Sequence, residues 1–181
     1  MSRIPLMLLL MLMLPCCGKG GDFLTASGVC EGYQDPATSP YRAPWPSGIQ
    51  RMIWQGNCGG LTHIGAFRFS YDIGMDIHSP ILAARDGTVL NVVQTYHDGN
   101  GCPHPNEIWV QHDDGTVGTY LHLTNQGSLV GIGDTVKQGQ QIAWSGLTGC
   151  TTGPHLHFAL YWLDTALDPA GVLPQPPPAA E

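Results

Sequence analysis

The sequence Gly153-Pro154-His155-Leu156-His157-Phe158 places two imidazoles where both could act at one metal ion. Side chains alternate between the faces of an extended strand, so His155 and His157 point the same way and Leu156 points into the opposite layer. Two such imidazoles can bind one metal together, or one can bind it while the other contacts the adjacent water or substrate. The alternative is a chance His-x-His on a polar strand face.

Three residues elsewhere in the chain could complete such a site. His63 and Asp72 lie upstream, and His122 lies in Tyr120-Leu121-His122-Leu123. A catalytic zinc site needs three protein ligands and one open position, and histidine and carboxylate side chains both serve as ligands. An imidazole also suits proton transfer, because its pKa lies near physiological pH.

The elements that must position these residues are short strands. The chain has 181 residues with 24 Gly and 15 Pro, and only 12% of its residues are charged, which favours turns and strands over helices. The apolar patterns predict strands at residues 67–72, 81–95 with a turn at Asp86-Gly87, 107–111, 117–121, 142–144 and 155–162. We therefore expect an all-β domain of short antiparallel strands, in two packed sheets or a partly open barrel, with the site in a groove between loops.

The remaining histidines fit simpler roles. Asp114-Gly115 is typical of a hairpin turn, and we expect His112 to make hydrogen bonds in that turn. His97 and His104 lie in a polar loop and are expected to be exposed. His122 is expected to end the second hairpin strand. It is a better candidate for a catalytic role than His112.

Several motifs in one order resemble the LytM/lysostaphin-type zinc peptidases, the M23 family of cell-wall endopeptidases. The resemblance runs from about His63 to Phe158, most of the expected mature chain. Its motifs are Ala83-Ala84-Arg85-Asp86-Gly87-Thr88-Val89, His112-Asp113-Asp114-Gly115-Thr116, Tyr120-Leu121-His122-Leu123, Gly133-Asp134-Thr135-Val136, Gly139-Gln140-Gln141-Ile142, Ser145-Gly146-Leu147-Thr148-Gly149 and Gly153-Pro154-His155-Leu156-His157-Phe158. Several ordered matches are far more specific than one short motif.

The resemblance also implies the first part of the metal site. Many family members have a His with an Asp four positions later, but position 72, where that His would fall, is Asp. Another subset has a His in a loop and then an aromatic-rich strand that ends in the ligand Asp, at a fixed distance before the Ala-Ala-Arg run. This pattern implies Asp72 and His63, nine positions earlier (72 − 63 = 9). Asp76 and His78 are the fallback pair, and otherwise they form a solvated turn.

The implied activity is hydrolysis of an amide bond with one Zn²⁺ per chain. His63, Asp72 and His157 would bind the metal, and His155 would position or deprotonate the water. His122 would stabilise the oxyanion or share the acid–base role. The implied partner is peptidoglycan, cleaved in its cross-links or stem peptides, with a D-Ala–diaminopimelate bond, a glycine-rich bridge or an elastin-like substrate left open.

Three other functions compete with this one. A non-catalytic cell-wall module that activates or recruits an amidase would resemble the peptidases but lack zinc ligands. A structural metal site would have a closed shell of four ligands, with both His155 and His157. The third is a biotinyl or lipoyl carrier, whose half-barrel turn resembles Gly133 to Gln140, but Lys137 lies in the wrong half of that pattern.

The first residues indicate export. Arg3 precedes an apolar run from Ile4 to Leu14, which is shorter than the roughly 18 residues of a spanning helix. The sequence Leu14-Pro15-Cys16-Cys17-Gly18 resembles a lipoprotein processing site, in which Cys16 or Cys17 would be lipidated. Simple secretion with cleavage nearby is the alternative. The expected location is the periplasm or the outer membrane as a lipoprotein, or otherwise the medium.

Four further cysteines, Cys30, Cys58, Cys102 and Cys150, form an even set that allows three pairings. The family resemblance places the loops of Cys102 and Cys150 at the rim of the groove, which implies the pairs Cys102–Cys150 and Cys30–Cys58. Free buried thiols and a zinc site built from Cys and His are the alternatives, although the chain has no Cys-x-x-Cys.

The net charge and the composition of the segments complete the expected organisation of the chain. The formal charge is −7 and no basic face is visible, so we expect no nucleic-acid partner. Contact with a membrane is expected only through an N-terminal lipid anchor, and the protein is expected to be a monomer. The expected parts are a signal segment at 1–17, a linker and irregular lead-in at 18–60, the peptidase-like domain at 61–170 and a Pro-rich tail at 171–181.

Overall fold

The computed structural model describes residues 39–56, 60–64, 67, 70–102, 104–163 and 172–174. The expected signal segment lies outside the described residues, as do Cys16, Cys17, Cys30 and Cys58. Within the described ranges, no helix is long and apolar enough to cross a membrane.

Short strands make up the fold, as the Gly- and Pro-rich sequence predicts. Described in chain order, they are β1 (Ile53–Gln55), β2 (Tyr71–Gly74), β3 (Pro80–Leu82), β4 (Gly87–Val93), β5 (Asn106–Gln111), β6 (Thr116–Ser128), β7 (Thr135–Val136), β8 (Gln141–Ser145), β9 (His155–Leu163) and β10 (Val172–Pro174). β1 belongs to the expected lead-in and β10 to the expected tail, so both segments contribute strands.

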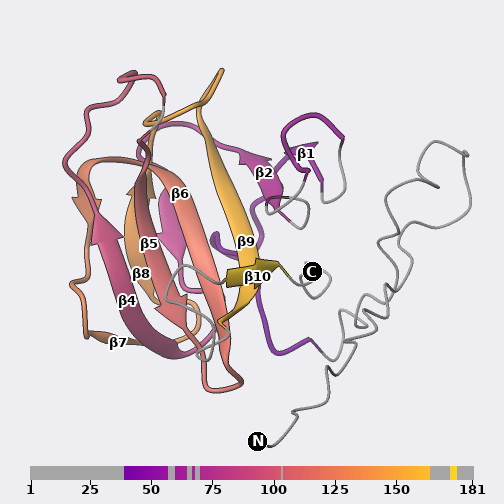
Figure 1. Ribbon diagram of the computed structural model, residues 1–181, viewed down its shortest axis with the longest axis vertical. Helices are drawn as coiled ribbons and strands as arrows, with labels where there is room; N and C mark the ends of the chain where they lie inside the picture. The colour runs from indigo at the N-terminus through magenta and orange to yellow at the C-terminus, as the bar shows by residue number, and fades with distance from the viewer. Residues whose placement is uncertain are drawn as a thin grey trace, which may run out of the picture. The chain divides into compact units, whose positions relative to one another are not determined.

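The strands are antiparallel and hydrogen-bonded into a single sheet. The main order is β1-β2-β9-β6-β5-β4-β7, and β10 pairs with β9. β3 pairs with β8, and β8 joins the far end of β6. In Figure 1 the long strands β4, β5, β6 and β9 run beside one another. The all-β class is confirmed, whereas a division into two separate sheets is not.

The core lies on the face of β9 opposite the His-x-His side chains. Leu156 is fully buried in it, whereas His155 and His157 occupy the other face, as the strand period predicts. The Tyr120 hydroxyl is buried and accepts a hydrogen bond from the Ala84 amide at 2.8 Å. Burial raises the pKa of Tyr120, so its phenol stays protonated.

Two expected strands have different limits in the structure. The strand expected at 67–72 begins only at Tyr71, because the amides of Phe67 and Ser70 bond to carbonyls three residues earlier. These are turn contacts, which an aromatic alternation does not exclude. β6 does not end at His122 but continues to Ser128. His122 is instead an extra residue, a β-bulge, within the continuing strand.

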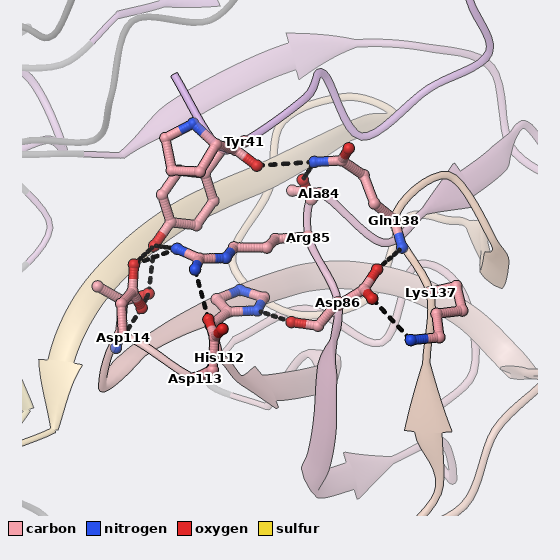
Figure 2. A network of polar contacts seen from close by, with 11 residues as sticks. Tyr41, Ala84, Arg85, Asp86, His112, Asp113, Asp114, Lys137 and Gln138 are labelled. Atoms are coloured by element: carbon pink, nitrogen blue, oxygen red, sulfur yellow. Dashed lines mark hydrogen bonds and ion pairs between the residues drawn. The ribbon is translucent and has the colours of Figure 1, made fainter. Parts of the chain in front are cut away.

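A polar network ties the lead-in to the tip of the β5–β6 hairpin (Figure 2). The Tyr41 hydroxyl donates to Asp114 Oδ2 at 2.7 Å, and the Arg85 guanidinium pairs with Asp113 and Asp114. The Tyr41 ring packs edge-on against His112, whose Nδ1 donates to the Asp86 carbonyl at 2.9 Å. His112 therefore has the expected structural role in the turn.

Candidate metal centre

The site begins with the pairing of β2 and β9. Asp72 is the cross-strand partner of His157, and Gly74 is the partner of His155. Cross-strand partners have their Cβ atoms about 5 Å apart, within reach of a carboxylate and an imidazole. The sheet register alone therefore places the carboxylate between the two imidazoles of β9.

One oxygen of Asp72 faces three imidazoles at short distance. Its Oδ1 lies 2.8 Å from His157 Nδ1, 3.2 Å from His63 Nε2 and 3.3 Å from His155 Nε2. These side chains are almost completely buried, His63 most of all. Four potential ligand groups therefore converge on one small volume.

Main-chain carbonyls fix the tautomers of three rings. The Gly56 carbonyl accepts from His63 Nδ1 at 2.8 Å, and the Gly153 carbonyl accepts from His155 Nδ1 at 2.9 Å. The Thr148 carbonyl accepts from His122 Nδ1 at 2.7 Å. A carbonyl can only accept, so each Nδ1 carries the proton and each neutral ring presents a lone pair at Nε2.

The donor atoms fit a divalent metal. When the His63 ring is neutral, its Nε2 lone pair faces Asp72 Oδ1 at 3.2 Å, and this contact does not have hydrogen-bond geometry. Two lone pairs at that separation repel each other unless a cation lies between them. One ligand atom each from His63, Asp72 and His157 lie within 4.8 Å of one another. Two nitrogens and one carboxylate oxygen are a donor set that suits zinc.

A second group of imidazoles lies beside the first. One ring nitrogen each from His122, His155 and His157 lie within 4.8 Å of one another. The rings of His122 and His155 are close, with centroids 4.6 Å apart. Within the described residues, His155 therefore lies between the two groups, because its Nε2 is also 3.3 Å from Asp72 Oδ1.

The backbone of His122 is strained. Its φ is 66°, in the left-handed region that residues other than glycine rarely occupy. Asn106 pairs with Leu123 and Glu107 pairs with Leu121, so His122 is an extra residue in β6, a β-bulge. Bulges redirect side chains and are frequent beside active sites, and backbone strain of this kind gathers there too.

Burial and mutual contacts set the protonation of the cluster. Burial alone would raise the pKa of Asp72, but the three surrounding imidazoles hold that pKa far below its usual range. Burial lowers the pKa of His157, and burial with the nearby His155 lowers the pKa of His122 to about 4. The pKa of His63 is raised, because the Asp72 carboxylate and the Gly56 carbonyl outweigh the effect of burial.

Two loops support the second group of imidazoles. A disulfide joins Cys102 to Cys150, the pair that the family resemblance implied. Asp98 Oδ1 accepts from the Leu147 amide at 2.6 Å, and Asn100 Oδ1 accepts from the Gly149 amide at 2.7 Å. These contacts hold the loop that supplies the Thr148 carbonyl to His122.

The other candidates lie away from the centre. Asp76 and His78 are exposed in the turn between β2 and β3, and neither belongs to a cluster of ligand atoms in the described part of the chain. His97 and His104 are exposed, as expected, and His104 stacks on Tyr96.

Trp54 was not among the residues predicted from the sequence to lie near the site, yet its ring centroid lies 5.6 Å from that of His155. The apolar pair Ile53-Trp54 was a strand signal inside a segment that we expected to be irregular. A short apolar run of this kind, bounded by glycine, could have identified β1.

Comparison with known proteins agrees with this geometry. Residues 67–169 match the model of peptidase family M23, and because this is more than half of the chain, the chain belongs to peptidase family M23. It is similar to the glycyl-glycine endopeptidase ALE-1 of Staphylococcus capitis, with 38% identity over 130 residues, 69% of this chain and 33% of that protein. It is also similar to the peptidoglycan DD-endopeptidase ShyC of Vibrio cholerae, with 43% identity over 82 residues, 45% of this chain and 17% of that protein.

Solved structures show the same fold. The catalytic domain of the prophage-encoded M23 protein EnpA from Enterococcus faecalis, solved as a single-residue variant, aligns with a TM-score of 0.54 and 26% identity, covering 76% of this chain and 96% of that chain. Lysostaphin from Staphylococcus simulans aligns with a TM-score of 0.50 and 29% identity, over 68% and 46% of the two chains. The chain spans about a third or less of the curated relatives described above.

Proposed function

We propose that this chain is a zinc-dependent endopeptidase that hydrolyses peptide cross-links or stem peptides of bacterial peptidoglycan. The observation that carries the proposal is the convergence of His63, Asp72 and His157 beside the close pair His122 and His155. The relatives ALE-1, a glycyl-glycine endopeptidase, and ShyC, a peptidoglycan DD-endopeptidase, support the substrate class.

In this proposal His63, Asp72 and His157 would hold one zinc ion per chain. When bound, zinc lowers the pKa of a water molecule to about 7 and polarises the carbonyl of the scissile amide. The carbonyl of Gly56 orients His63, and the cross-strand pairing of Asp72 with His157 orients the other two ligands. The ligand set is therefore held by main-chain contacts and sheet register.

His155 is assigned the role of general base. Its Nδ1–H is held by the Gly153 carbonyl, and so Nε2 is the atom that can accept a proton from water. The protonated ring then donates that proton from Nε2 to the leaving amine. His155 Nε2 lies 3.3 Å from Asp72 Oδ1, which places it next to the proposed metal ligands.

His122 is assigned a shared acid–base role. Because its Nδ1–H is taken by the Thr148 carbonyl, the neutral ring offers a lone pair at Nε2 and has no second proton to donate. It can therefore hydrogen-bond to a developing oxyanion only after it has accepted a proton. This assignment favours proton transfer over standing oxyanion stabilisation at His122.

Two rival functions have less support. An amidase-activating module is expected to lack zinc ligands, whereas a full set of ligand residues lies together here. A closed structural metal site would use His155 as a fourth ligand. The ring of His155 is also close to that of His122, a neighbour that a purely structural site does not need.

We propose that the protein acts after export, because its proposed substrate lies outside the cytoplasm. The anchor is a lipid on Cys17 or Cys16, or else the leader is simply removed. Mass spectrometry of the N-terminal peptide from the native host distinguishes these outcomes, since a diacylated cysteine has a characteristic mass.

The deciding experiment is digestion of purified peptidoglycan by the mature protein. It is run as purified, with a chelator, and with zinc restored, and the new amine ends are located by mass spectrometry. Release of cross-link fragments that stops with chelator and returns with zinc supports the endopeptidase and identifies the bond. If nothing is released and the protein holds no metal, the activator function replaces it.

A further inference from the structure

One row of cross-strand partners links the proposed metal ligands to Glu107. Strand by strand, the row runs through Asp72, His157, Leu121 and Glu107. Cross-strand partners share one face of a sheet, so the Glu107 side chain stands on the face of the ligands, whereas its neighbour Ile108 is buried in the core. Neighbouring strands lie about 4.8 Å apart, so two strand spacings separate Glu107 from His157 by about 10 Å.

The Glu107 carboxyl can accept further hydrogen bonds from a ligand. Leu121 and Glu107 each keep part of their surface exposed, so a substrate at the metal ligands can also reach this carboxyl. Asn91 Nδ2 donates to Glu107 Oε1 at 2.9 Å. The indole N–H of Trp109 also favours the charged carboxyl, but it makes no well-formed hydrogen bond within the described residues. A carboxylate has about four acceptor positions, so several remain for solvent or a ligand.

No cationic side chain compensates Glu107 in the part of the chain that the structure describes. Burial is the largest influence on the pKa of Glu107 and raises it, and the opposing influences come from two neutral side chains, Trp109 and Asn91. A carboxylate that is removed from water without a cationic partner costs free energy. The position therefore favours a ligand that brings a positive charge.

The other described charges have partners or positions of their own. Arg85 and Lys137 are paired with aspartates on other elements. Arg42 and Arg51 belong to the lead-in, and Arg51 lies two residues before β1, which is four strands from β5 in the order of the sheet. Asp72, the other carboxylate of the row, is surrounded by three imidazoles. The carboxyl on β5 is thus the member of the row that is left for a cationic ligand.

Resting on the proposed function, we propose that Glu107 is a specificity residue that binds a primary ammonium group of the substrate peptide. The ammonium donates to the acceptor positions that Asn91 leaves, and its charge compensates the carboxylate. A peptide advances about 3.5 Å per residue, so 10 Å from His157 corresponds to about three residues, or to fewer residues and an extended side chain. The side chain of a diamino acid and the free end of a peptide bridge both carry such an ammonium.

Digestion of partly acetylated peptidoglycan tests this proposal by internal competition. Acetylation removes the charge of an amine, so each cleavable peptide is present in a charged and an uncharged form. Mass spectrometry compares the two forms among the released fragments, and tandem spectra locate the amine that matters. The zinc-loaded full chain is compared with Glu107→Gln, Glu107→Asp and the control Asp134→Asn, which removes one negative charge from an exposed turn. Circular dichroism and zinc content verify that each variant is folded.

We expect wild-type protein to release peptides with the free amine about tenfold faster than their acetylated forms, the contribution of one hydrogen bond to a charged group. Glu107→Gln should release both forms at the slower rate, Glu107→Asp should keep part of the preference, and Asp134→Asn should match wild type. A purely structural role of Glu107 would slow both forms equally and leave the preference intact.

The outcomes separate this proposal from the proposed function. Release without preference by wild type, or a preference that survives in Glu107→Gln, would overturn the ammonium site and leave the endopeptidase standing. Absence of release from acetylated and untreated peptidoglycan alike would overturn both. A preference located at the diamino side chain or at the bridge end supports the site and identifies the source of the ammonium.

Discussion

Nε2 of His63 lies 3.2 Å from Oδ1 of Asp72, although His63 comes from the loop after β1 and Asp72 from β2. When the imidazole is neutral, it and the carboxylate both present lone pairs across this gap, so a metal cation stabilises the contact. We predict that His63→Ala lowers zinc affinity by at least about tenfold. Removal of a residue that only hydrogen-bonds to a metal ligand already costs about that much, so removal of a ligand should cost no less. Competition with a chromogenic chelator measures the affinity.

The matched control for His63 is Asp76→Ala. Asp76 is the acidic residue of the fallback pair, and it is exposed. Unchanged zinc affinity in Asp76→Ala, alongside the loss in His63→Ala, supports the ligand set. The reverse result would move the metal to the turn before β3.

The two histidines of β9 are expected to respond differently to substitution. His157→Ala should lose both zinc and activity, because it removes a proposed ligand. His155→Ala should retain zinc and lose about 10²- to 10⁴-fold in kcat, the usual contribution of a general base. Metal analysis and peptidoglycan hydrolysis measure the two effects. Equal zinc loss in both variants would mean that both imidazoles are ligands.

The Cys102–Cys150 disulfide should matter for turnover more than for metal binding. The double variant Cys102→Ser/Cys150→Ser should lose about 2–4 kcal/mol in the free energy of unfolding, because the bond closes a loop across a sequence separation of 48. The freed loop carries the Thr148 carbonyl that orients His122, and misplacement of that ring should lower kcat by about tenfold.

Zinc content separates the positioning effect of the disulfide from general unfolding. None of the proposed ligands lies in the two joined loops, so the double variant should hold as much zinc as wild type at a temperature where both are folded. A variant with unchanged kcat, or one that loses zinc together with activity, would show that the disulfide does not act through His122.

Tyr41→Phe should destabilise the fold without changing the chemistry. The Tyr41 hydroxyl is buried between Asp114 and Thr116, and its loss leaves the carboxylate without one donor (Figure 2). We expect a loss of about 1 kcal/mol in the free energy of unfolding, measured with urea. Tyr96→Phe is the matched control, because the Tyr96 hydroxyl makes no hydrogen bond within the described residues. Equal free energies of unfolding for the two variants would show that the Tyr41 hydrogen bonds do not stabilise the fold.

Glu107 should make stability depend on pH in the acid range. Burial raises the pKa of Glu107 above its ordinary value of 4.5, so the folded protein binds this proton more tightly than the unfolded chain. The contribution of Glu107 is therefore fully present below about pH 4.5 and is lost as the pH rises through the folded pKa. Glu107→Gln removes this titration and can still accept the hydrogen bond from Asn91.

The expected signature is a difference between wild type and Glu107→Gln that changes with pH. The free energy of unfolding of Glu107→Gln should rise relative to wild type as the pH increases from about 4.5 through the raised pKa of Glu107. Subtraction of the two curves removes the other carboxylates. A constant difference, or one of opposite slope, would contradict the buried protonated form.

Structural features that depend on local periodicity could be predicted from the sequence. Alternation placed His155 and His157 on one face and Leu156 in the core, and Asp114-Gly115 predicted the β5–β6 hairpin. Both patterns involve neighbours in the chain, where strand geometry leaves few alternatives. The resemblance to a family supplied the long-range relation of Asp72 to His157, which no period contains.

Other features depended on contacts that local patterns do not encode. The bulge at His122 follows from how β6 pairs with β5, and apolar alternation predicted instead that the strand would end there. Trp54 was missed because its significance comes from its position against His155 and from two glycines, Gly74 and Gly153, that leave room for its ring. A single sequence does not show which of many glycines faces a ring.

The partners of His63, His122 and His155 have a consequence for how this protein can diverge. Each Nδ1 is held by a peptide carbonyl, from Gly56, Thr148 and Gly153, and every residue type has such a carbonyl. The orientation of the rings therefore depends on the path of the loops and much less on the side chains that those loops carry. Loop surfaces that meet a substrate can change residue by residue while the imidazoles stay fixed, so new cleavage preferences are accessible by point mutation without rebuilding the catalytic centre.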